Sequence, residues 1–264
     1  MQLQSITYQS TQIFYRTAGK GKPVVLIHGF AENGDIWKNQ IEFLKDHFYL
    51  IIPDLPGSGR SSVISRQPAV GIEEYADVIK AVLDEEKISQ CSMAGHSMGG
   101  YIGLAFAEKY PEILSSLALV HSSAFADSEE KKANRLKSIE FVKKNGAYEF
   151  LKAAIVDLFT EKWASENAAI VEAQVEKGKA FTDEAIVQYY RAMIARPDRT
   201  HVLKNFPKPI LFIIGEHDKA VPFEQSMQQC YLPVQSHIHI LRNSAHMGML
   251  EEAGKVNNAL LQLK

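Results

Sequence analysis

The sequence predicts an α/β fold, with a mostly parallel sheet flanked by helices and a helical insertion between two of its strands. Short runs rich in Val, Ile and Leu occur without polar alternation, which is typical of strands buried on both faces. Amphipathic helical stretches separate these runs, as right-handed β-α-β crossovers require. From residue 122 to residue 206, helical patterns follow one another and no strand pattern occurs, which indicates the insertion.

The strands follow from apolar runs and from alternation, in chain order. Residues 1–17 alternate apolar and polar side chains around a turn at Gln9–Gln12, which predicts an antiparallel pair. Ser236–Leu241 also alternates, as expected of a strand at the edge of the sheet. The continuous apolar runs between them are Pro23–His28, Phe48–Pro53, Cys91–Ala94, Leu117–Val120 and Ile210–Ile214.

The helices follow from apolar positions at helical spacing. Three are predicted among the strands, and the last of them is apolar nearly all round, so it should be buried: Ile36–Asp46, Ile72–Glu86 and Met98–Tyr110. Four more are predicted in the insertion: Asp127–Lys144, Ala147–Phe159, Ala164–Lys177 and Thr182–Ala195. We therefore expect a core made of residues 1–121 and 207–264, with residues 122–206 as a helical cap, or lid.

Composition excludes several classes of function. The 264 residues carry a formal net charge of −2, so there is no basic excess for nucleic-acid binding. No apolar run is long enough to insert into a membrane, and the first residues lack the pattern of a secretion signal. Cys91 and Cys230 lack a CxxC spacing and fit a reduced, cytoplasmic protein. A homo-oligomer is compatible with the sequence, which does not determine the oligomeric state.

The segment Gly95-His96-Ser97-Met98-Gly99 has the pattern G-x-S-x-G. This pattern forms a sharp turn from strand to helix, and the turn lifts the serine above the sheet. The predicted strand before it and the buried helix after it supply the structural context that the motif requires. Ser97 is therefore the predicted nucleophile.

A serine hydroxyl needs a base, and the base needs an orienting acceptor. Both should lie in loops at the carboxyl ends of strands. His246 follows the last predicted strand and is the predicted base; Asp218 follows Ile210–Ile214 and is the predicted acid, with Glu216 as a rival. The other histidines, His121 among them, are interpreted as ordinary surface or core side chains. His237 and His239 share one face of a strand, but no third residue has the spacing to complete a metal site with them. The chemistry needs neither a metal nor an organic cofactor.

An acyl-transfer site also needs N–H donors for the carbonyl oxygen, each worth about 3 kcal/mol. The backbone N–H groups of Met98 and Phe30 are the predicted donors, because Met98 follows the nucleophile and Phe30 lies in the loop after Pro23–His28. Core packing is the better explanation for the aromatic residues of the cap, but five side chains remain candidates for the substrate pocket: Phe30, Phe125, Phe159, Trp163 and Met247.

With these motifs the chain resembles the α/β-hydrolase superfamily, in its branch of small helical-capped serine hydrolases. The matching stretches are VVLIHGF, WKNQIEFLKDHFYLIIPDLPGSGRSS, MAGHSMGGYIGLAFAEKYPE, PILFIIGEHDKAVP and NSAHMGMLEE. The resemblance implies an eight-stranded, mostly parallel sheet with a helical cap over the site. It also implies the order nucleophile, acid, base, which Ser97, Asp218 and His246 follow, and the oxyanion donors Phe30 and Met98.

Departures from the family's subgroups narrow the function. Ser97 stands where haloalkane dehalogenases and epoxide hydrolases carry aspartate, and Met98 where prolyl aminopeptidases carry tryptophan. The segment His28–Ala31 differs from the HGxGPG-like segment of carbon–carbon bond hydrolases. We expect a carboxylesterase-like serine hydrolase that cleaves a small-molecule carboxylic ester or related acyl compound through an acyl-enzyme. The alternatives are hydrolysis of a lactone, a thioester or a carbon–carbon bond, and a non-enzymatic ligand sensor on the same fold.

Overall fold

The strands form one eight-stranded sheet in the order β1-β2-β4-β3-β5-β6-β7-β8, in a computed structural model that describes residues 1–65 and 70–263. Strands β1 and β2 run antiparallel to their neighbours, and the strands from β4 through β3 to β8 are mutually parallel. The predicted mostly parallel sheet is thus confirmed. The strands are β1 (Gln2–Tyr8), β2 (Thr11–Gly19), β3 (Pro23–Ile27), β4 (Tyr49–Pro53), β5 (Cys91–His96), β6 (Leu114–Val120), β7 (Ile210–Gly215) and β8 (Ser236–Leu241).

The strand order reverses at β3, and this positions the site. After β3 the chain moves to β4 on one side, and it then returns past β3 to β5 on the other side. The loops that leave the carboxyl ends of β3 and β5 therefore diverge, and parallel sheets place their ligand crevices at such a switch point. Residues 28–33 and the turn at Ser97 both lie there.

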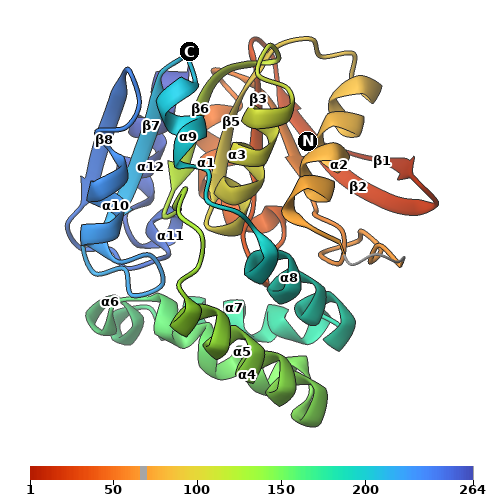
Figure 1. Cartoon of the computed structure of the whole chain (residues 1–264), viewed down its shortest axis with the longest axis vertical. Coiled ribbons are helices and arrows are strands. Elements are labelled where there is room, and N and C mark those ends of the chain that lie inside the picture. The colour runs from red at the N-terminus through yellow and green to blue at the C-terminus, as the bar shows by residue number, and fades with distance from the viewer. Residues whose placement is uncertain (66–69, 264) are drawn as a thin grey trace.

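Helices cover both faces of the sheet (Figure 1). On one face α2 (Ile72–Glu85) and α9 (Thr200–Asn205) pack against α3 (Met98–Lys109). On the other face α1 (Lys38–Leu44) packs against α12 (Ala253–Leu260). Shorter helices complete the set: η1 (Gly34–Trp37), α10 (Phe223–Gln229), α11 (Gly248–Glu251) and η4 (Leu261–Leu263). Met98–Ala107 is buried on every side, as predicted for this helix.

A layer of helices lies beyond the carboxyl ends of the parallel strands, at the bottom of Figure 1. We call it the helical layer, and its elements lie within residues 129–195. The layer consists of α4 (Glu129–Asn145), α5 (Ala147–Ala154), η2 (Val156–Leu158), α6 (Glu161–Glu166), α7 (Ala168–Lys177), η3 (Gly178–Ala180) and α8 (Asp183–Ala195).

The helices of residues 122–206 differ from the prediction in several places, and the predicted helix Ala147–Phe159 is α5 followed by the separate 3-10 helix η2. The predicted helix Ala164–Lys177 is two helices, because Thr160 caps an earlier start and Asn167, at φ −127° and ψ 36°, breaks the helix. Helix α9 was not predicted; it lies inside the stretch 122–206 but packs beside α3 on the sheet. Within residues 1–65 and 70–263, no helix has both the length and the apolarity needed to cross a membrane.

Candidate active site

Ser97 occupies a strained turn between β5 and α3. Its φ of 51° and ψ of −115° are rarely adopted by residues other than glycine. Two glycines make the turn possible by close approach. A Cβ atom on Gly95 would lie 2.3 Å from the carbonyl of Gly99, and one on Gly99 would lie 2.3 Å from the carbonyl oxygen of Ile27. The motif therefore holds α3 against β3 and β5 and presents Ser97 at the edge of the sheet.

Asp218 and His246 come together from the loops after β7 and β8. His246 Nδ1 lies 2.7 Å from Asp218 Oδ2, and both side chains are buried. The backbone N–H groups of Ala220 and Val221 donate to Asp218 Oδ1 at 2.8 and 2.9 Å. Burial alone would raise the pKa of Asp218, but the neighbouring histidines outweigh it and hold the pKa well below its usual value. Asp218 is thus a charged acceptor that orients the imidazole.

Glu216, the rival acid, pairs with a different side chain. Its Oε2 atom accepts from Arg242 Nη1 at 3.2 Å in a partly exposed ion pair. The geometry therefore favours Asp218 over Glu216 as the partner of His246.

One large cavity brings the predicted nucleophile and base together. It has a volume of about 760 Å³ and lies between the sheet and the helical layer, with Ser97, His246 and Phe30 among its lining residues. Within the described residues no hydrogen bond joins Ser97 Oγ to His246. Such bonds are commonly long in unliganded enzymes and shorten when the substrate binds.

The two predicted oxyanion donors are free. Met98 is the first residue of α3, so its N–H has no acceptor within the helix. Within the described part of the chain, the N–H of Phe30 has no acceptor either. The loop that carries Phe30 touches the nucleophile turn, because a Cβ atom on Gly29 would lie 3.1 Å from Ser97 Cβ.

The candidate pocket side chains separate into two groups. Phe30 and Phe125 line the large cavity, and Met247 lines a smaller pocket that Phe30 also borders. Phe159 and Trp163 are not among the residues that line either pocket. Their ring centres lie 5.2 Å apart and their planes are 5° from parallel, so the two rings stack on each other. Phe159 borders a separate pocket. The geometry therefore does not support a substrate-lining role for this pair.

A buried ion pair beside Ser97 could not be recognised from the sequence. Glu32 Oε2 lies 2.9 Å from His96 Nδ1 and accepts the N–H of Gly29 at 2.6 Å. His96 Nε2 lies 2.9 Å from the carbonyl oxygen of His246. Burial would lower the pKa of His96, but the charge and the hydrogen bond of Glu32 raise it. Burial would raise the pKa of Glu32, but His96 lowers it. This pair joins the loop after β3 to the segments that carry Ser97 and His246.

His121 was also missed, although it directly follows β6. Its Nδ1 atom lies 3.4 Å from Asp218 Oδ2, and within the described residues neither ring nitrogen has a hydrogen-bond partner. Burial lowers the pKa of His121 to about 4, so the ring is neutral at pH 7. The position at the carboxyl end of a strand, which identified Ser97 and Asp218, was the available signal.

His121, Asp218 and His246 also form a cluster that could hold a metal ion. Their ligand atoms lie within 4.8 Å of one another. The sequence predicts no metal site. In the cluster as it stands, the Nδ1 of His246 is engaged by Asp218, so a metal would have to replace that hydrogen bond.

Comparison with known proteins relates more than half of the chain to one family. A family described as the alpha/beta hydrolase fold matches residues 22–168. RutD of Agrobacterium fabrum, to which a carbamate hydrolase activity is ascribed, is 27% identical over 253 residues, which cover 95% of this chain and 96% of RutD.

Two further proteins are similar along nearly the whole chain. The 2-hydroxy-6-oxo-6-(2'-aminophenyl)hexa-2,4-dienoic acid hydrolase of Metapseudomonas resinovorans is 29% identical, over 94% of this chain and 85% of its own length. The structure of a thermophilic esterase from Thermogutta terrifontis with malate bound superimposes with a TM-score of 0.92. That esterase is 29% identical, and the match covers 99% of this chain and 97% of the esterase.

Proposed function

We propose that this chain, which belongs to the α/β-hydrolase fold family, is a serine hydrolase of small-molecule carboxylic esters or related acyl compounds. Membership of the family makes it a hydrolase; the serine mechanism and the ester substrate are the proposal. One observation carries it: His246, which is hydrogen-bonded to Asp218, lines the same cavity as Ser97.

In the first half of the reaction, His246 Nε2 takes the proton of the Ser97 hydroxyl as Ser97 Oγ attacks the substrate carbonyl. Asp218 holds the Nδ1–H tautomer of His246 and stabilises the imidazolium that forms. The N–H groups of Phe30 and Met98 donate to the oxygen that becomes negative. His246 then gives its proton to the leaving alcohol, and the acyl group remains on Ser97.

In the second half, water replaces the alcohol. His246 removes a proton from water as the water attacks the acyl-enzyme, and the same N–H groups stabilise the second oxyanion. The proton then returns to Ser97 Oγ as the carboxylic acid leaves. Because Glu32 and His96 tie the loop of Gly29 to the turn of Ser97, the donors keep their positions through both halves.

Residues 122–206 act as the cap in this proposal, with α9 as the exception that belongs to the flank of the sheet. Side chains of α4, α5 and α8 close the cavity opposite Ser97, among them Arg135, Leu151 and Tyr190. A cap that excludes water strengthens the electrostatic interactions in the site and decides which acyl groups fit.

The ester is preferred to other scissile bonds because of the esterase of Thermogutta terrifontis, which matches nearly the whole chain at a TM-score of 0.92. The relative from Metapseudomonas resinovorans keeps carbon–carbon bond hydrolysis as the second candidate, since it is equally similar in sequence. The segment His28–Ala31 argues against that candidate, as it lacks the small-residue pattern expected there.

The test is hydrolysis of p-nitrophenyl esters of short and long acyl chains by the native protein and by Ser97→Ala. We expect clear native activity and a loss of about a thousandfold or more in Ser97→Ala. Equal activity of the two proteins would refute the serine mechanism. A native protein that is inert on all esters but cleaves a vinylogous diketone would favour the carbon–carbon candidate.

A further inference from the structure

Three charged side chains meet on the cap side of the cavity. Asp127, whose side chain is fully buried, accepts from Arg135 Nε at 2.6 Å and forms an ion pair with Arg196 Nη1 at 3.0 Å. Burial opposes ionisation of Asp127, but Arg135 and Arg196 outweigh it, so its pKa is lowered. One carboxylate is therefore shared by two guanidinium groups, and one positive charge is left over.

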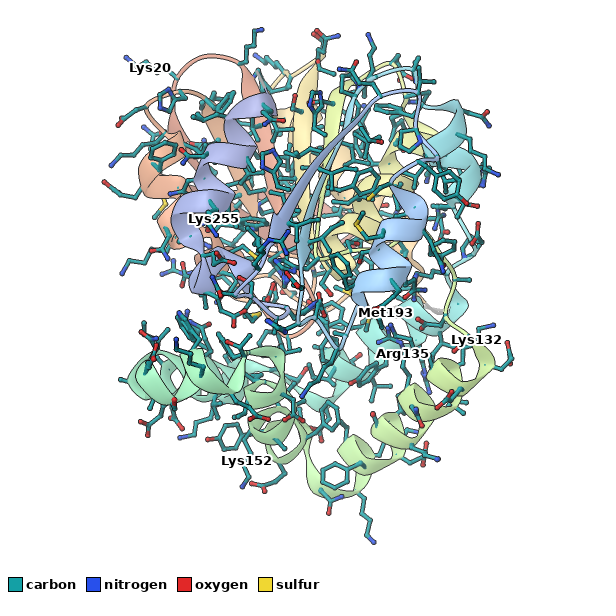
Figure 2. The ribbon with its side chains drawn as sticks, turned by 90° about the vertical axis from the view of Figure 1, so that its left-hand side faces the viewer. Lys20, Lys132, Arg135, Lys152, Met193 and Lys255 are labelled. Carbon is teal, nitrogen blue, oxygen red and sulfur yellow. The ribbon has the colours of Figure 1, made fainter. Side chains whose placement is uncertain are left out.

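The guanidinium nitrogens of Arg196 bind other groups of the protein, whereas those of Arg135 are only partly occupied. Arg196 donates to the carbonyl oxygens of Met193 and Phe125 as well as contacting Asp127. Arg135 contacts Asp127 through Nε and Nη2, and within the described residues its Nη1 makes no hydrogen bond. Figure 2 places Arg135 and Met193 on the side of the helical layer that faces the sheet, whereas Lys152 lies on the outer side of the layer. Both Arg135 and Met193 line the cavity.

A second unused donor lies in the same cavity. Tyr101 is on α3, four residues after Ser97, and its side chain is only 3% exposed. The guanidinium of Arg196 lies 3.9 Å from the centre of the Tyr101 ring and holds the ring in place. Within the described part of the chain, the Tyr101 hydroxyl has no hydrogen-bond partner. Neither Arg135 Nη1 nor the Tyr101 hydroxyl is among the buried polar atoms of the described residues that lack a partner, so both donors are open to the cavity and available to an acceptor on a ligand.

The other charges around the cavity do not cancel the surplus. Lys131 adds a further positive charge near Asp127, with its Nζ on the carbonyl oxygen of Ala220. Glu32 is compensated by His96. Glu130 and Asp198 also line the cavity but are exposed, where solvent screens them.

We propose that Arg135 and Tyr101 bind a carboxylate of the substrate, so that this enzyme acts on acyl compounds that carry a free carboxylate away from the scissile bond. The guanidinium supplies charge and Nη1–H donors, and the tyrosine supplies an O–H donor, which together satisfy a carboxylate. This inference rests on the proposed serine-hydrolase function, because it places the carboxylate in the cavity of Ser97.

The test compares matched neutral and anionic esters. One pair is p-nitrophenyl hexanoate and mono-p-nitrophenyl glutarate, which differ in the acyl part; the other is phenyl acetate and 4-acetoxybenzoate, which differ in the leaving group. In at least one pair we expect the native enzyme to favour the anionic ester in kcat/KM by tenfold or more. Arg135→Gln should abolish that preference, lowering kcat/KM for the anionic ester by at least about tenfold more than for its neutral partner.

Two further variants guard against misfolding and against a general charge effect. Tyr101→Phe, which removes only the hydroxyl, should lower the preference for the anionic ester by several-fold. Arg191→Gln, an exposed arginine of α8, should leave the preference unchanged.

The failure of this inference is distinguishable from the failure of the proposed function. If neutral esters are cleaved with dependence on Ser97 but neither anionic ester is favoured, or if Arg135→Gln keeps the preference, the carboxylate site is refuted alone. If no ester is cleaved in a Ser97-dependent way, the serine-hydrolase proposal itself fails.

Discussion

Asp218 joins two buried histidines of different character. Its Oδ2 atom faces His246 at 2.7 Å and His121 at 3.4 Å, while Oδ1 is held by two backbone N–H groups. His246 lines the cavity, whereas His121 is not among the lining residues. His121 therefore contributes to the environment of the carboxylate rather than to the reaction itself.

The low pKa of His121 predicts a specific acid sensitivity. Burial lowers this pKa from 6.5 to about 4, so the unfolded chain binds a proton between these values and the folded chain does not. The contribution of neutral His121 to the free energy of unfolding is present above pH 6.5. This contribution is lost as the pH falls toward 4, and the total loss is about 3 kcal/mol. In His121→Gln this loss should disappear.

The measurement is the free energy of unfolding in urea at pH 7 and pH 5. Between these values the native protein should lose about 2 kcal/mol more than His121→Gln does. An equal loss in both proteins would mean that His121 does not titrate as its burial requires.

Among the elements, the packing of α3 against the sheet depends on a glycine. A Cβ atom on Gly99 would lie 2.3 Å from the carbonyl oxygen of Ile27 and 2.7 Å from that of His28. Both are backbone atoms, so relief requires a shift of α3 or β3. We expect Gly99→Ala to destabilise the protein by about 2 kcal/mol or more and to lower kcat, since α3 carries the N–H of Met98.

Gly254 is the matched control for this substitution. It is also in a helix, α12, and a Cβ atom there would have no neighbour within 4 Å. Gly254→Ala should be neutral or stabilising by up to about 1 kcal/mol, because alanine favours the helix. Similar thermal melting temperatures for the two variants would contradict the close packing assigned to Gly99.

The sequence predicts the presence of these elements better than their ends, because pairing and backbone conformation set the ends. The alternating and apolar runs identify all eight strands, but β5 extends to His96 because pairing with β6 continues through Gly95 and His96. Apolar spacing runs on through Asn167, so the break between α6 and α7 is set by a backbone conformation that periodicity does not reveal.

The site shows the same limit. That Ser97, Asp218 and His246 lie at one edge of the sheet could be predicted, because each follows a strand in a recognisable segment. Glu32, His96 and Arg135 could not, since their roles arise from contacts between loops and helices distant in sequence. The stacking of Phe159 on Trp163 also depends on tertiary packing, which the sequence pattern does not determine.

In the whole molecule, hydrogen bonds join the helical layer to the loop that carries His246. Glu251 Oε1 accepts from the N–H and hydroxyl of Thr160, and its Oε2 accepts from the N–H of Ala245, next to His246. The N–H of His246 itself donates to the carbonyl oxygen of Leu158 in the layer, at 2.9 Å. Movement of the layer and placement of His246 are therefore linked.

Removing this link should affect turnover more than binding. We expect Glu251→Ala to lower stability by about 1–3 kcal/mol and to reduce kcat several-fold with a smaller change in KM, because the loop of His246 loses an anchor. Glu172→Ala, an exposed glutamate on α7, is the control and should change neither. A rise in KM at unchanged kcat would place the role of Glu251 in substrate binding instead.

The most direct test of the central claim is covalent labelling by a fluorophosphonate, followed by intact mass and peptide mapping. An activated serine displaces fluoride and keeps the phosphonyl group, so the native protein should gain one adduct, on the peptide that contains Ser97. His246→Ala should label far more slowly, and Ser97→Ala should not label. An adduct on another residue, or equal labelling of Ser97→Ala, would contradict the account.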